Sequence, residues 1–335
     1  MGSEMCIRDR CGALPKEFDK SEWDVRVVIP NYSCIPESFR NEFRYVTHFY
    51  MSTGSYIQNK YVGVLQYELD GIKYYFIDNQ EYFDSFLPYG NVRYDIEKFC
   101  FFDKAVLSML PLIGFKPDII HCHDWQTGMV PVLLNAYYNK DTFYQGIKTV
   151  FTIHNLRYQG IYSIDIVSDF FSLNRDFFTA DKLEFHGCAN LLKGGIVYSD
   201  YITTVSPTYA SEIQTPMGGE KLDGLLSARS QSLYGILNGI DYNVYNPKTD
   251  KYIFENYDAR NVVNKKRENK MKLQQQLGLT VDGEKVMIGI ISRLVDQKGF
   301  DIIAEAMGEL MNMDIQLVVV GTGCLLYTSP SPRDP

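Results

Sequence analysis

Residues 121–128, HCHDWQTG, bring two of the chain's five histidines, a thiol and a carboxylate into four consecutive positions. In an extended strand, His121 and His123 point to the same face, and His154 follows another β-branched run. Three histidines with an open position can hold catalytic zinc, with Asp124 orienting a ligand. The alternatives are a strand end whose Asp124 caps the next helix, or a polar site without metal. No HExxH or similar zinc spacing is present, so we favour the polar site.

A second group of charged residues lies in SRLVDQKGFD, residues 292–301. Arg293 comes just after a predicted strand, and Lys298 lies where a helix is expected to begin. A guanidinium offers a bidentate fork to phosphate oxygens, and an ammonium offers a point charge. A helix N-terminus beside them adds its dipole. This combination fits a pyrophosphate, and the alternative is a solvated charged surface.

Two shorter motifs carry polar side chains suited to sugars or to turns. TIHNLRYQG ends a predicted strand with His154 and Asn155, whose side chains can hydrogen-bond sugar hydroxyls. GILNGID places Asn238 and Gly239 after an apolar run, which suits a turn or a close approach of the backbone to a ligand. Each motif alone is also compatible with an ordinary surface turn.

The elements that must position these residues alternate in type. Short β-branched runs and longer helical patterns follow one another, which predicts an α/β protein with parallel sheets. The predicted strands are 24–30, 117–123, 148–155, 201–207, 286–292 and 315–321, and the predicted helices are 127–138, 186–198, 258–277 and 299–313. The run 61–78 alternates around an Asp-Gly pair, which predicts a β-hairpin.

Polar residues recur where the predicted strands end. The strings HCHD, TIHN, VSPT, ISRL and VVGTG each follow an apolar run. In open parallel sheets, ligands bind in the crevice beyond the carboxyl ends of the strands. Five such coincidences predict a ligand cleft at these ends.

The composition limits the possible functions of the chain. A formal charge of −8 over 335 residues argues against a nucleic-acid partner. The apolar runs are too short to span a membrane, and no signal peptide is recognised, so we expect no membrane partner. Seven cysteines lie without CxxC spacing, which indicates reduced thiols and a cytoplasmic protein.

We expect two α/β domains between foreign ends. Residues 1–10 and 324–335 continue no periodicity and resemble translated adapter sequence, so they are left out of the fold. An Asn- and Tyr-rich stretch near 241–258 separates an N-terminal domain, 11–245, from the start of a second domain, 246–323.

In order along the chain, these strings resemble the bacterial glycogen synthase and plant starch synthase family. The resemblance runs from GALPKEF and DVRVVIPNYSCIP through YYFIDNQEYF, HCHDWQTG, TIHNLRYQG, VSPTYASEIQTP and KLDGLLSARS to GILNGIDYNVYNP and SRLVDQKGFD. It implies a GT-B fold with two Rossmann-like domains. It also implies transfer of glucose from ADP-glucose, or UDP-glucose, to the non-reducing end of an α-1,4-glucan. Configuration is retained, and neither a metal nor a cofactor is needed.

The resemblance also implies residue roles. His154 matches the family's catalytic histidine and is expected to contact the donor glucose. Arg293 and Lys298 match the pair that clamps the diphosphate and stabilises its developing charge, and Asp124 belongs to the HDW motif at the glucose. Substrate contacts are implied for Trp125, Gln126 (where many members have histidine), Asn155, Asn238, Gly239 and Tyr89.

Two family motifs are not found in the sequence. They are the lysine-containing KxGGL loop expected before GALPKEF and a donor-gripping glutamate motif expected after Gly323. The N-terminal domain is therefore expected to lack its first strand and loop. Because positioning supplies several kcal/mol of a barrier, we expect this 335-residue chain to be inactive, although the intact protein is a transferase.

Three other functions remain as alternatives. The first is a GT-B transferase with another donor or acceptor, and the KLDGLL and YYFIDNQEYF strings argue against it. The second is a zinc hydrolase that uses His121, His123 and His154. The third is a glucan-binding protein without activity, since 25 tyrosines could stack on sugars, although most are expected to be core or ordinary surface residues.

Overall fold

The computed structural model describes residues 12–55, 57–84 and 92–321. Contacts divide the chain into two compact units, Cys6–Asn238 and a second unit that contains Gly239–Pro335. The two ends expected to be foreign, 1–10 and 324–335, lie outside the described residues, as does Tyr89. All six strands predicted from the β-branched runs are present.

A fully parallel sheet, sheet B, forms the centre of the first unit. Its strand order is β11-β10-β6-β5, and every neighbouring pair is parallel. The strands are β5 (Ile119–His123), β6 (Lys148–Ile153), β10 (Tyr201–Thr204) and β11 (Leu233–Gly235). Their carboxyl ends therefore share one edge, which brings the HCHD and TIHN segments together.

A second sheet of the same unit, sheet A, is mostly antiparallel. It has the order β1-β4-β3-β2, and β1 is parallel to β4. The strands are β1 (Arg26–Pro30), β2 (Arg44–Thr53), β3 (Ile57–Leu69) and β4 (Ile72–Asp78). The predicted hairpin is confirmed. Its turn residues Asp70 and Gly71 have φ of 54° and 73°, the left-handed backbone of a type I′ turn.

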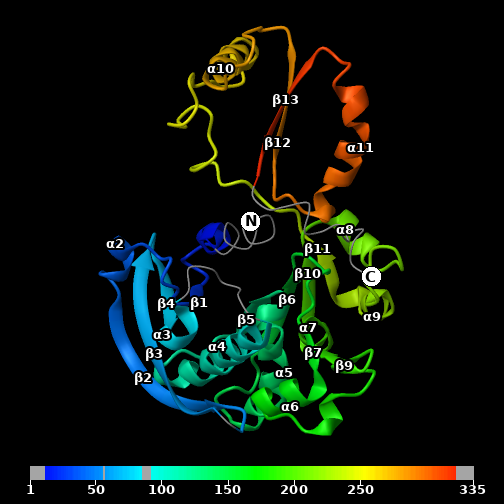
Figure 1. The fold of residues 1–335 in the computed structure, drawn as a ribbon. Helices are drawn as coiled ribbons and strands as arrows, with labels where there is room; N and C mark the ends of the chain where they lie inside the picture. Colours follow the sequence, from blue (N-terminus) through cyan, green and yellow to red (C-terminus); the bar gives the residue numbers. More distant parts are fainter. Residues whose placement is uncertain (1–11, 56, 85–91, 322–335) are drawn as a thin grey trace. The chain divides into compact units, whose positions relative to one another are not determined.

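The helix α4 (Val92–Leu112), labelled in Figure 1, contributes to two separate hydrophobic cores. Ile96, Phe99 and Leu107 belong to the core around sheet B. Phe101 and Met109 belong to the core that backs sheet A. Because α4 faces both cores, only a narrow polar stripe that includes Glu97, Lys104 and Ser108 stays partly exposed.

Sheet B is covered on its apolar face by α5 (Met129–Ala136) and α7 (Leu191–Tyr198), which bury most of their residues. The close approach of α7 to β6 depends on Gly195, where a Cβ would lie 2.5 Å from the Phe151 ring. The helix predicted over 186–198 begins only at Leu191, so the prediction of helix for residues 186–190 was wrong.

Those five residues belong largely to a small antiparallel sheet of β8 (Glu184–Phe185), β9 (Cys188–Asn190) and β7 (Ile161–Ser163). Gly187 turns this hairpin with a φ of 82°. The remaining helices of the unit are short. They are η1 (Leu14–Glu17), α2 (Glu37–Arg40), α3 (Gln80–Phe83), η2 (Trp125–Thr127), η3 (Tyr138–Lys140), α6 (Ile164–Phe171), η4 (Arg175–Phe177), α8 (Pro207–Glu212), α9 (Asp223–Ala228) and η5 (Ser230–Ser232).

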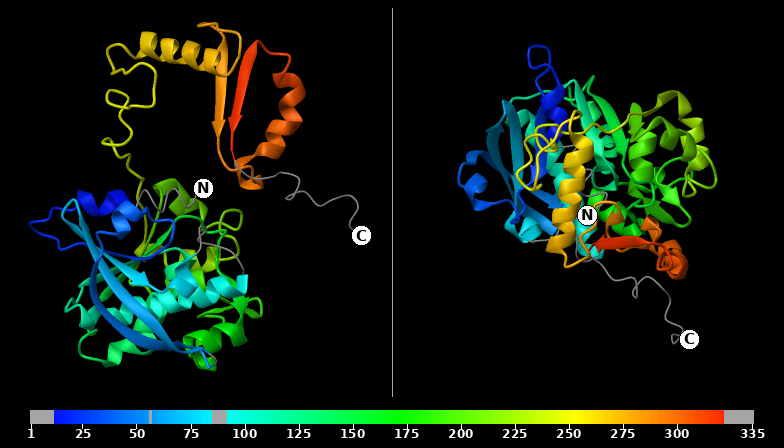
Figure 2. Two further views of the ribbon diagram at one scale, coloured as in Figure 1. Left: turned by 60° about the vertical axis from the view of Figure 1, so that its left-hand side comes forward. Right: turned by 90° about the horizontal axis from the view of Figure 1, so that it is seen from above.

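The second unit contains one parallel strand pair. It comprises β12 (Val286–Ile291) and β13 (Ile315–Val320), joined through η6 (Asp296–Lys298) and α11 (Phe300–Leu310), as seen from two sides in Figure 2. The helix α10 (Val262–Gln276) precedes them. This is the strand–helix–strand order that the sequence predicts for 286–321.

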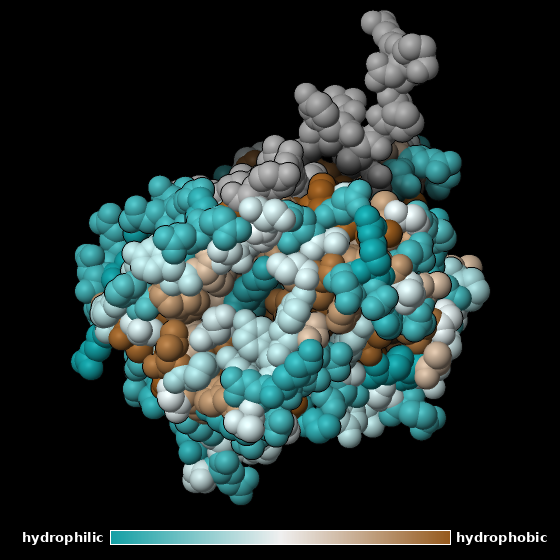
Figure 3. Space-filling model, turned by 90° about the horizontal axis from the view of Figure 1, so that it is seen from below, coloured by the Kyte–Doolittle hydropathy of each residue, from teal (hydrophilic) through white to brown (hydrophobic). Residues whose placement is uncertain are grey.

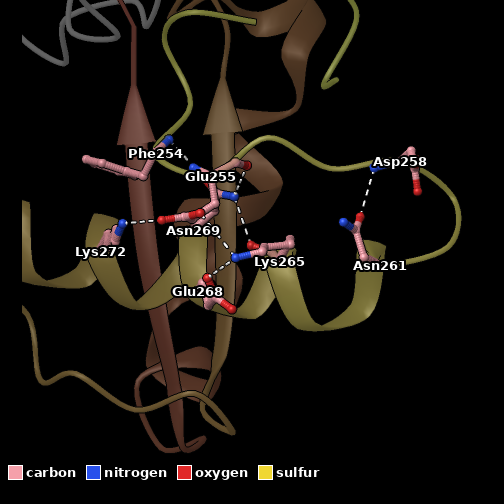
Figure 4. A network of polar contacts seen from close by, with 8 residues as sticks. All are labelled: Phe254, Glu255, Asp258, Asn261, Lys265, Glu268, Asn269 and Lys272. Carbon is pink, nitrogen blue, oxygen red and sulfur yellow. Dashed lines mark hydrogen bonds and ion pairs between the residues drawn. The ribbon is translucent and has the colours of Figure 1, made fainter. Parts of the chain in front are cut away.

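A polar network ties the segment before α10 onto that helix (Figure 4). The carboxylate of Glu255 pairs with Lys265 at 3.1 Å and with Lys272 at 2.6 Å. Asn269 Oδ1 accepts hydrogen bonds from the backbone N–H groups of Phe254 and Glu255. The segment is therefore held to α10, although it has no regular structure of its own.

Candidate active site

The residue that ends β5 has an unusual backbone conformation. Asp124 has φ 54° and ψ −174°, a region that glycine occupies readily and other residues rarely. Its N–H nevertheless donates to the carbonyl of Thr152 at 3.0 Å, so it remains joined to the neighbouring strand β6. Such strain costs on the order of 1–3 kcal/mol and is concentrated at functional sites.

The Asp124 carboxylate links the ends of β5 and β6. Its Oδ1 accepts the backbone N–H of His154 at 2.8 Å, and the N–H of Asn155 also donates to it. It makes no capping hydrogen bond to the helix that follows it, so the helix-cap interpretation was wrong. Burial raises the Asp124 pKa to about 7, against the lowering effect of the two N–H donors.

The three histidines of the two motifs lie at the same edge of sheet B. His123 Nδ1 and His154 Nε2 share a hydrogen bond of 3.1 Å. His121 Nε2 is instead hydrogen-bonded to Thr152 Oγ1 at 2.6 Å, and Thr152 Oγ1 to Thr203 Oγ1 at 2.6 Å. Within residues 12–55, 57–84 and 92–321, no group of three or more His, Cys, Asp or Glu side chains is placed to hold a metal ion.

Trp125 lies beneath the site and leaves only 8% of its surface exposed. Its indole packs edge-on against Phe99, with ring centroids 5.1 Å apart, and also lies close to Tyr162. Gly160 lies directly against it, since a Cβ there would be 2.5 Å from Trp125 Cε3. Trp125 therefore supports the loop that carries His154 and offers little surface to a ligand.

That loop is anchored by residues that the sequence did not single out as functional. Buried Gln159 accepts a hydrogen bond from Asn190 Nδ2 at 2.5 Å and donates to the carbonyl of Glu220. The Tyr209 hydroxyl accepts the N–H of Leu156 at 3.1 Å. Amide and hydroxyl side chains are common in loops and strands, so no sequence signal separates these anchors from ordinary turn residues.

The other expected substrate contacts are more exposed. Gln126 lies half-buried in η2, and Asn155 is half-buried directly after His154. Asn238 and Gly239 are exposed, three and four residues after β11 ends at Gly235. The structure therefore brings His154, Asp124 and Asn155 together at the ends of β5 and β6, and Asn238 follows β11, which is separated from β6 by β10.

Arg293 and Lys298 belong to the second unit, which is described by itself. Ser292 continues the sheet by donating its N–H to the Val320 carbonyl at 3.1 Å, and Arg293 follows it. The Nε of Arg293 is buried and has no hydrogen-bond partner in the described part of the chain. Lys298 is exposed, and Gly299 then turns with a φ of 68° into α11. Both cations thus lie between a strand end and a helix start, as predicted.

Two surface cavities of the first unit lie elsewhere. One of about 290 Å³ is lined by residues that include Lys104, Tyr137 and Phe171. Another of about 400 Å³ is lined by residues that include Asp165 and Asp169. Neither contains a predicted site residue, so the candidate site rests on the geometry of the strand ends. The surface seen from below is mostly hydrophilic, with apolar residues in scattered areas (Figure 3).

Curated relatives of the chain are glycogen synthases. The chain is 54% identical over 317 residues to the glycogen synthase of Lachnospira eligens and 53% identical over the same length to that of Lachnoclostridium phytofermentans. Both matches cover 95% of this chain and 66% of the relative. The chain thus spans just under two thirds of the length of these relatives.

A solved structure agrees with this match. The catalytic domain of starch synthase IV from Arabidopsis thaliana, bound to ADP and acarbose, superposes with a TM-score of 0.83 at 31% identity. The match covers 94% of this chain and 64% of that one, and it confirms the predicted α/β GT-B fold. The family described as starch synthase catalytic domain matches residues 8–228. The chain therefore belongs to the glycogen and starch synthase family of glycosyltransferases.

Proposed function

We propose that this chain is part of an enzyme that transfers glucose from ADP-glucose to the non-reducing end of an α-1,4-glucan with retention of configuration. The bond between the glucose C1 and the diphosphate oxygen breaks, and C1 forms a bond to the acceptor's 4-oxygen. The acceptor hydroxyl loses its proton, and ADP leaves. The observation that carries the proposal is the joining of His154 to buried Asp124 at the carboxyl edge of sheet B, in a chain of this family.

His154 and Asp124 form the glucose side of the proposed site. A histidine ring nitrogen can hydrogen-bond a glucose hydroxyl. Asp124 holds the backbone of His154 and Asn155, and His123 holds the ring of His154. Positioning of this kind lowers a barrier because the bound sugar needs no further reorganisation. Asn155, Asn238 and Gly239 remain proposed donor-side contacts, with Gln126 and Tyr89 on the acceptor side.

Arg293 and Lys298 of the second unit are the proposed diphosphate-binding residues. The guanidinium of Arg293 supplies a fork for two phosphate oxygens, and Lys298 supplies a point charge. The first turn of α11 directly follows Lys298 and adds unpaired N–H groups. Negative charge grows on the diphosphate as the glycosidic bond breaks, so these groups stabilise the transition state more than the bound donor.

We also propose that the enzyme acts in the cytoplasm. The described cysteines Cys34, Cys100, Cys122 and Cys188 are all free thiols, as is usual in reducing compartments. Within the described residues, no helix is both long and apolar enough to cross a membrane.

The function is tested with the intact protein that carries this sequence. We expect it to incorporate radiolabelled glucose from ADP-glucose into maltoheptaose, and more slowly from UDP-glucose. His154→Ala and Lys298→Ala are each expected to lower kcat at least 100-fold, because they remove a contact at the reacting group. Lys140→Ala, at an exposed site in η3 away from these strand ends, is the matched control. Faster transfer from UDP-glucose than from ADP-glucose would refute ADP-glucose as the preferred donor. No transfer from either nucleotide sugar would refute the proposed glucosyltransferase activity.

The 335-residue chain is a separate case. It spans 66% of the length of its relatives, and we propose that it does not elongate maltoheptaose on its own. Robust glucan elongation by the purified chain would contradict this proposal and leave the assignment of the intact enzyme untouched.

A further inference from the structure

Four aromatic rings gather on the outer face of sheet A, away from the strand ends that carry His154. We call Tyr45, His48 and Tyr50 on β2 and Tyr61 on β3 the aromatic platform. Neighbouring ring centroids within it lie 5.8–6.1 Å apart. Tyr45 is 58% exposed, Tyr50 is 56% and Tyr61 is 37%. Exposed rings gathered in this way indicate an interaction surface, whereas single exposed rings do not.

The two faces of sheet A are used differently. Val62, Val64 and Ile77 point into the core that contains residues of α4. On the outer face, Phe43 stacks on Phe76 at 4.0 Å, so the segment that follows α2 covers part of this face. The aromatic platform occupies the remaining part and stays exposed.

The backbone beneath the aromatic platform is adapted to the rings. Gly63 pairs with His48 in the strand register. A Cβ at Gly63 would lie 2.8 Å from the Tyr61 hydroxyl oxygen and 3.1 Å from Asp78 Cβ. The glycine thus lets the Tyr61 ring lie flat across the strand. Asp78, which pairs with Gly63 on the other side and accepts a hydrogen bond from Asn31 at 2.8 Å, adds a carboxylate at the rim.

We propose that the aromatic platform binds an α-glucan chain, as a contact separate from the candidate active site; this rests on the proposed glucan acceptor. A glucose ring presents apolar C–H faces, which pack on aromatic rings, and hydroxyls at its edges, which suit the Tyr hydroxyls and Asp78. The platform contains no lysine or arginine, and the chain carries a net charge of −8. An uncharged polyhydroxyl ligand therefore fits it, and a phosphate-bearing one does not.

The arrangement suits a polymer better than a single sugar. Tyr45 and Tyr50 lie five residues apart on one strand, which is at most roughly 16 Å at about 3.3 Å per residue. Such a length allows successive glucose units of one chain to contact successive rings. Holding a glucan at a second point raises the effective concentration of its ends near the enzyme, without new contacts at the reacting atoms.

The test is binding of maltoheptaose to the 335-residue chain, measured by calorimetry and by tryptophan fluorescence. We expect the double variant Tyr50→Ala/Tyr61→Ala to weaken calorimetric binding at least 10-fold, and Tyr50→Trp/Tyr61→Trp to restore it. Tyr201→Ala/Tyr234→Ala is the matched control, since these rings lie 6.2 Å apart on sheet B and are each 49% exposed. Thermal unfolding of each variant checks that the fold is intact.

Three outcomes would overturn the inference. They are no glucan binding by the wild-type chain, an equal loss of affinity in the Tyr201/Tyr234 control, or a glucan affinity, by calorimetry and tryptophan fluorescence, that is unchanged in the Tyr50/Tyr61 variant. Sedimentation velocity adds a fourth, a dimer abolished by that variant without any change in glucan affinity. The proposed function is judged separately, because elongation of maltoheptaose by the intact enzyme is measured with the aromatic platform present.

Discussion

Asp124 combines a strained backbone with a buried carboxyl group, and both features follow from its position between two strand ends. Its pKa of about 7 lies well above the value of about 3.9 for an unfolded chain. Between these values the folded state holds a proton that the unfolded state has released. The stability of the protein should therefore fall as the pH rises from about 4 to 7.

We predict that Asp124→Asn removes this part of the pH dependence. The amide oxygen can still accept the two N–H bonds, and it has no charge to bury. The free energy of unfolding of the variant minus that of the wild type should rise by on the order of 4 kcal/mol from pH 4 to pH 8. This follows from about 1.4 kcal/mol per pKa unit. Urea unfolding at several pH values measures the difference, and parallel stability curves for the two proteins would contradict it.

Asp200→Asn is the matched control for this experiment. Burial raises the Asp200 pKa, but hydrogen bonds from Lys148 and Thr149 outweigh it and hold the pKa below its usual range. The stability that Asp200 contributes is therefore present at neutral pH and is lost as the pH falls below about 4. Its replacement should lower stability at pH 7 and leave the decline between pH 4 and 7 unchanged.

A second residue-scale prediction concerns the glycine under Trp125. Gly160→Ala adds a Cβ 2.5 Å from the indole and should destabilise the protein by about 2–4 kcal/mol, from overpacking and backbone strain together. Gly114→Ala separates the two effects, because Gly114 has the same φ of 62° but no atom within 4 Å of its Cβ position. It should cost about 1 kcal/mol. Equal melting temperatures for the two variants would contradict the role of Gly160.

For single residues, the sequence predicted that Asp124 and His154 lie close together, but not the hydrogen bond between them. The rule that ligands bind at strand ends correctly brought Asp124 and His154 to one edge of sheet B. It could not show that Asp124 accepts the His154 N–H, because that bond depends on the strained φ of Asp124. Thr152 and Thr203 were not recognised as the partners beside His121, since threonine is ordinary in any strand.

At the scale of elements, one arginine holds the end of α7 to the strand that follows it. Arg229 donates to the carbonyls of Ile196 and Val197 through one nitrogen and to those of Ser199 and Asp200 through another. These are carbonyls at and just beyond the helix end, which lack intrahelical partners. The guanidinium therefore closes the α7–β10 connection.

We predict that Arg229→Lys destabilises the protein by about 2–3 kcal/mol. An ammonium cannot reproduce the forked set of hydrogen bonds, so buried carbonyls lose their donors. Arg175→Lys is the control. Its ion pair with Asp165 is exposed on both sides, and such pairs contribute about 0–1 kcal/mol. Urea midpoints measure both changes, and an equal shift would argue against the bridging role.

Element prediction from the sequence found β1, β5, β6, β10, β12 and β13, but it missed the strands β2 and β11 and the helices α4 and α6 and misplaced the start of α7. The helix α4 was not predicted, because the charged residues Asp95, Lys98 and Asp103 are buried among its apolar residues and interrupt the apolar pattern that identifies a helix. The expected helix over 186–198 began too early, because the short strand β9 runs directly into the apolar start of α7. Periodicity cannot separate a short buried strand from a helix start.

At the scale of the whole molecule, the two units differ in how much apolar surface they bury. Both hydrophobic cores belong to the first unit. Among the described residues of the second unit, Phe300 is the only buried apolar side chain, and Ile291 and Ile302 are 86% and 67% exposed. The second unit should therefore open at a lower free energy.

We predict that amide hydrogen exchange is at least 100-fold faster in β12 and β13 than in β6 and β10. Both pairs are parallel neighbours in their sheets, so the comparison holds strand type constant and varies burial. Mass spectrometry of peptic fragments measures the rates. Equal protection would show that the second unit is as stable as the first.

The position of α4 between two cores has a consequence for synthesis on the ribosome. Sheet A emerges before α4, so its inner apolar face has no cover until α4 follows it. The other side of α4 then has no cover until β5 and β6 emerge, and those strands in turn await α7. Each stage of translation thus exposes the apolar surface that the next stage buries. The nascent chain should bind holding chaperones continuously until about residue 240 leaves the exit tunnel.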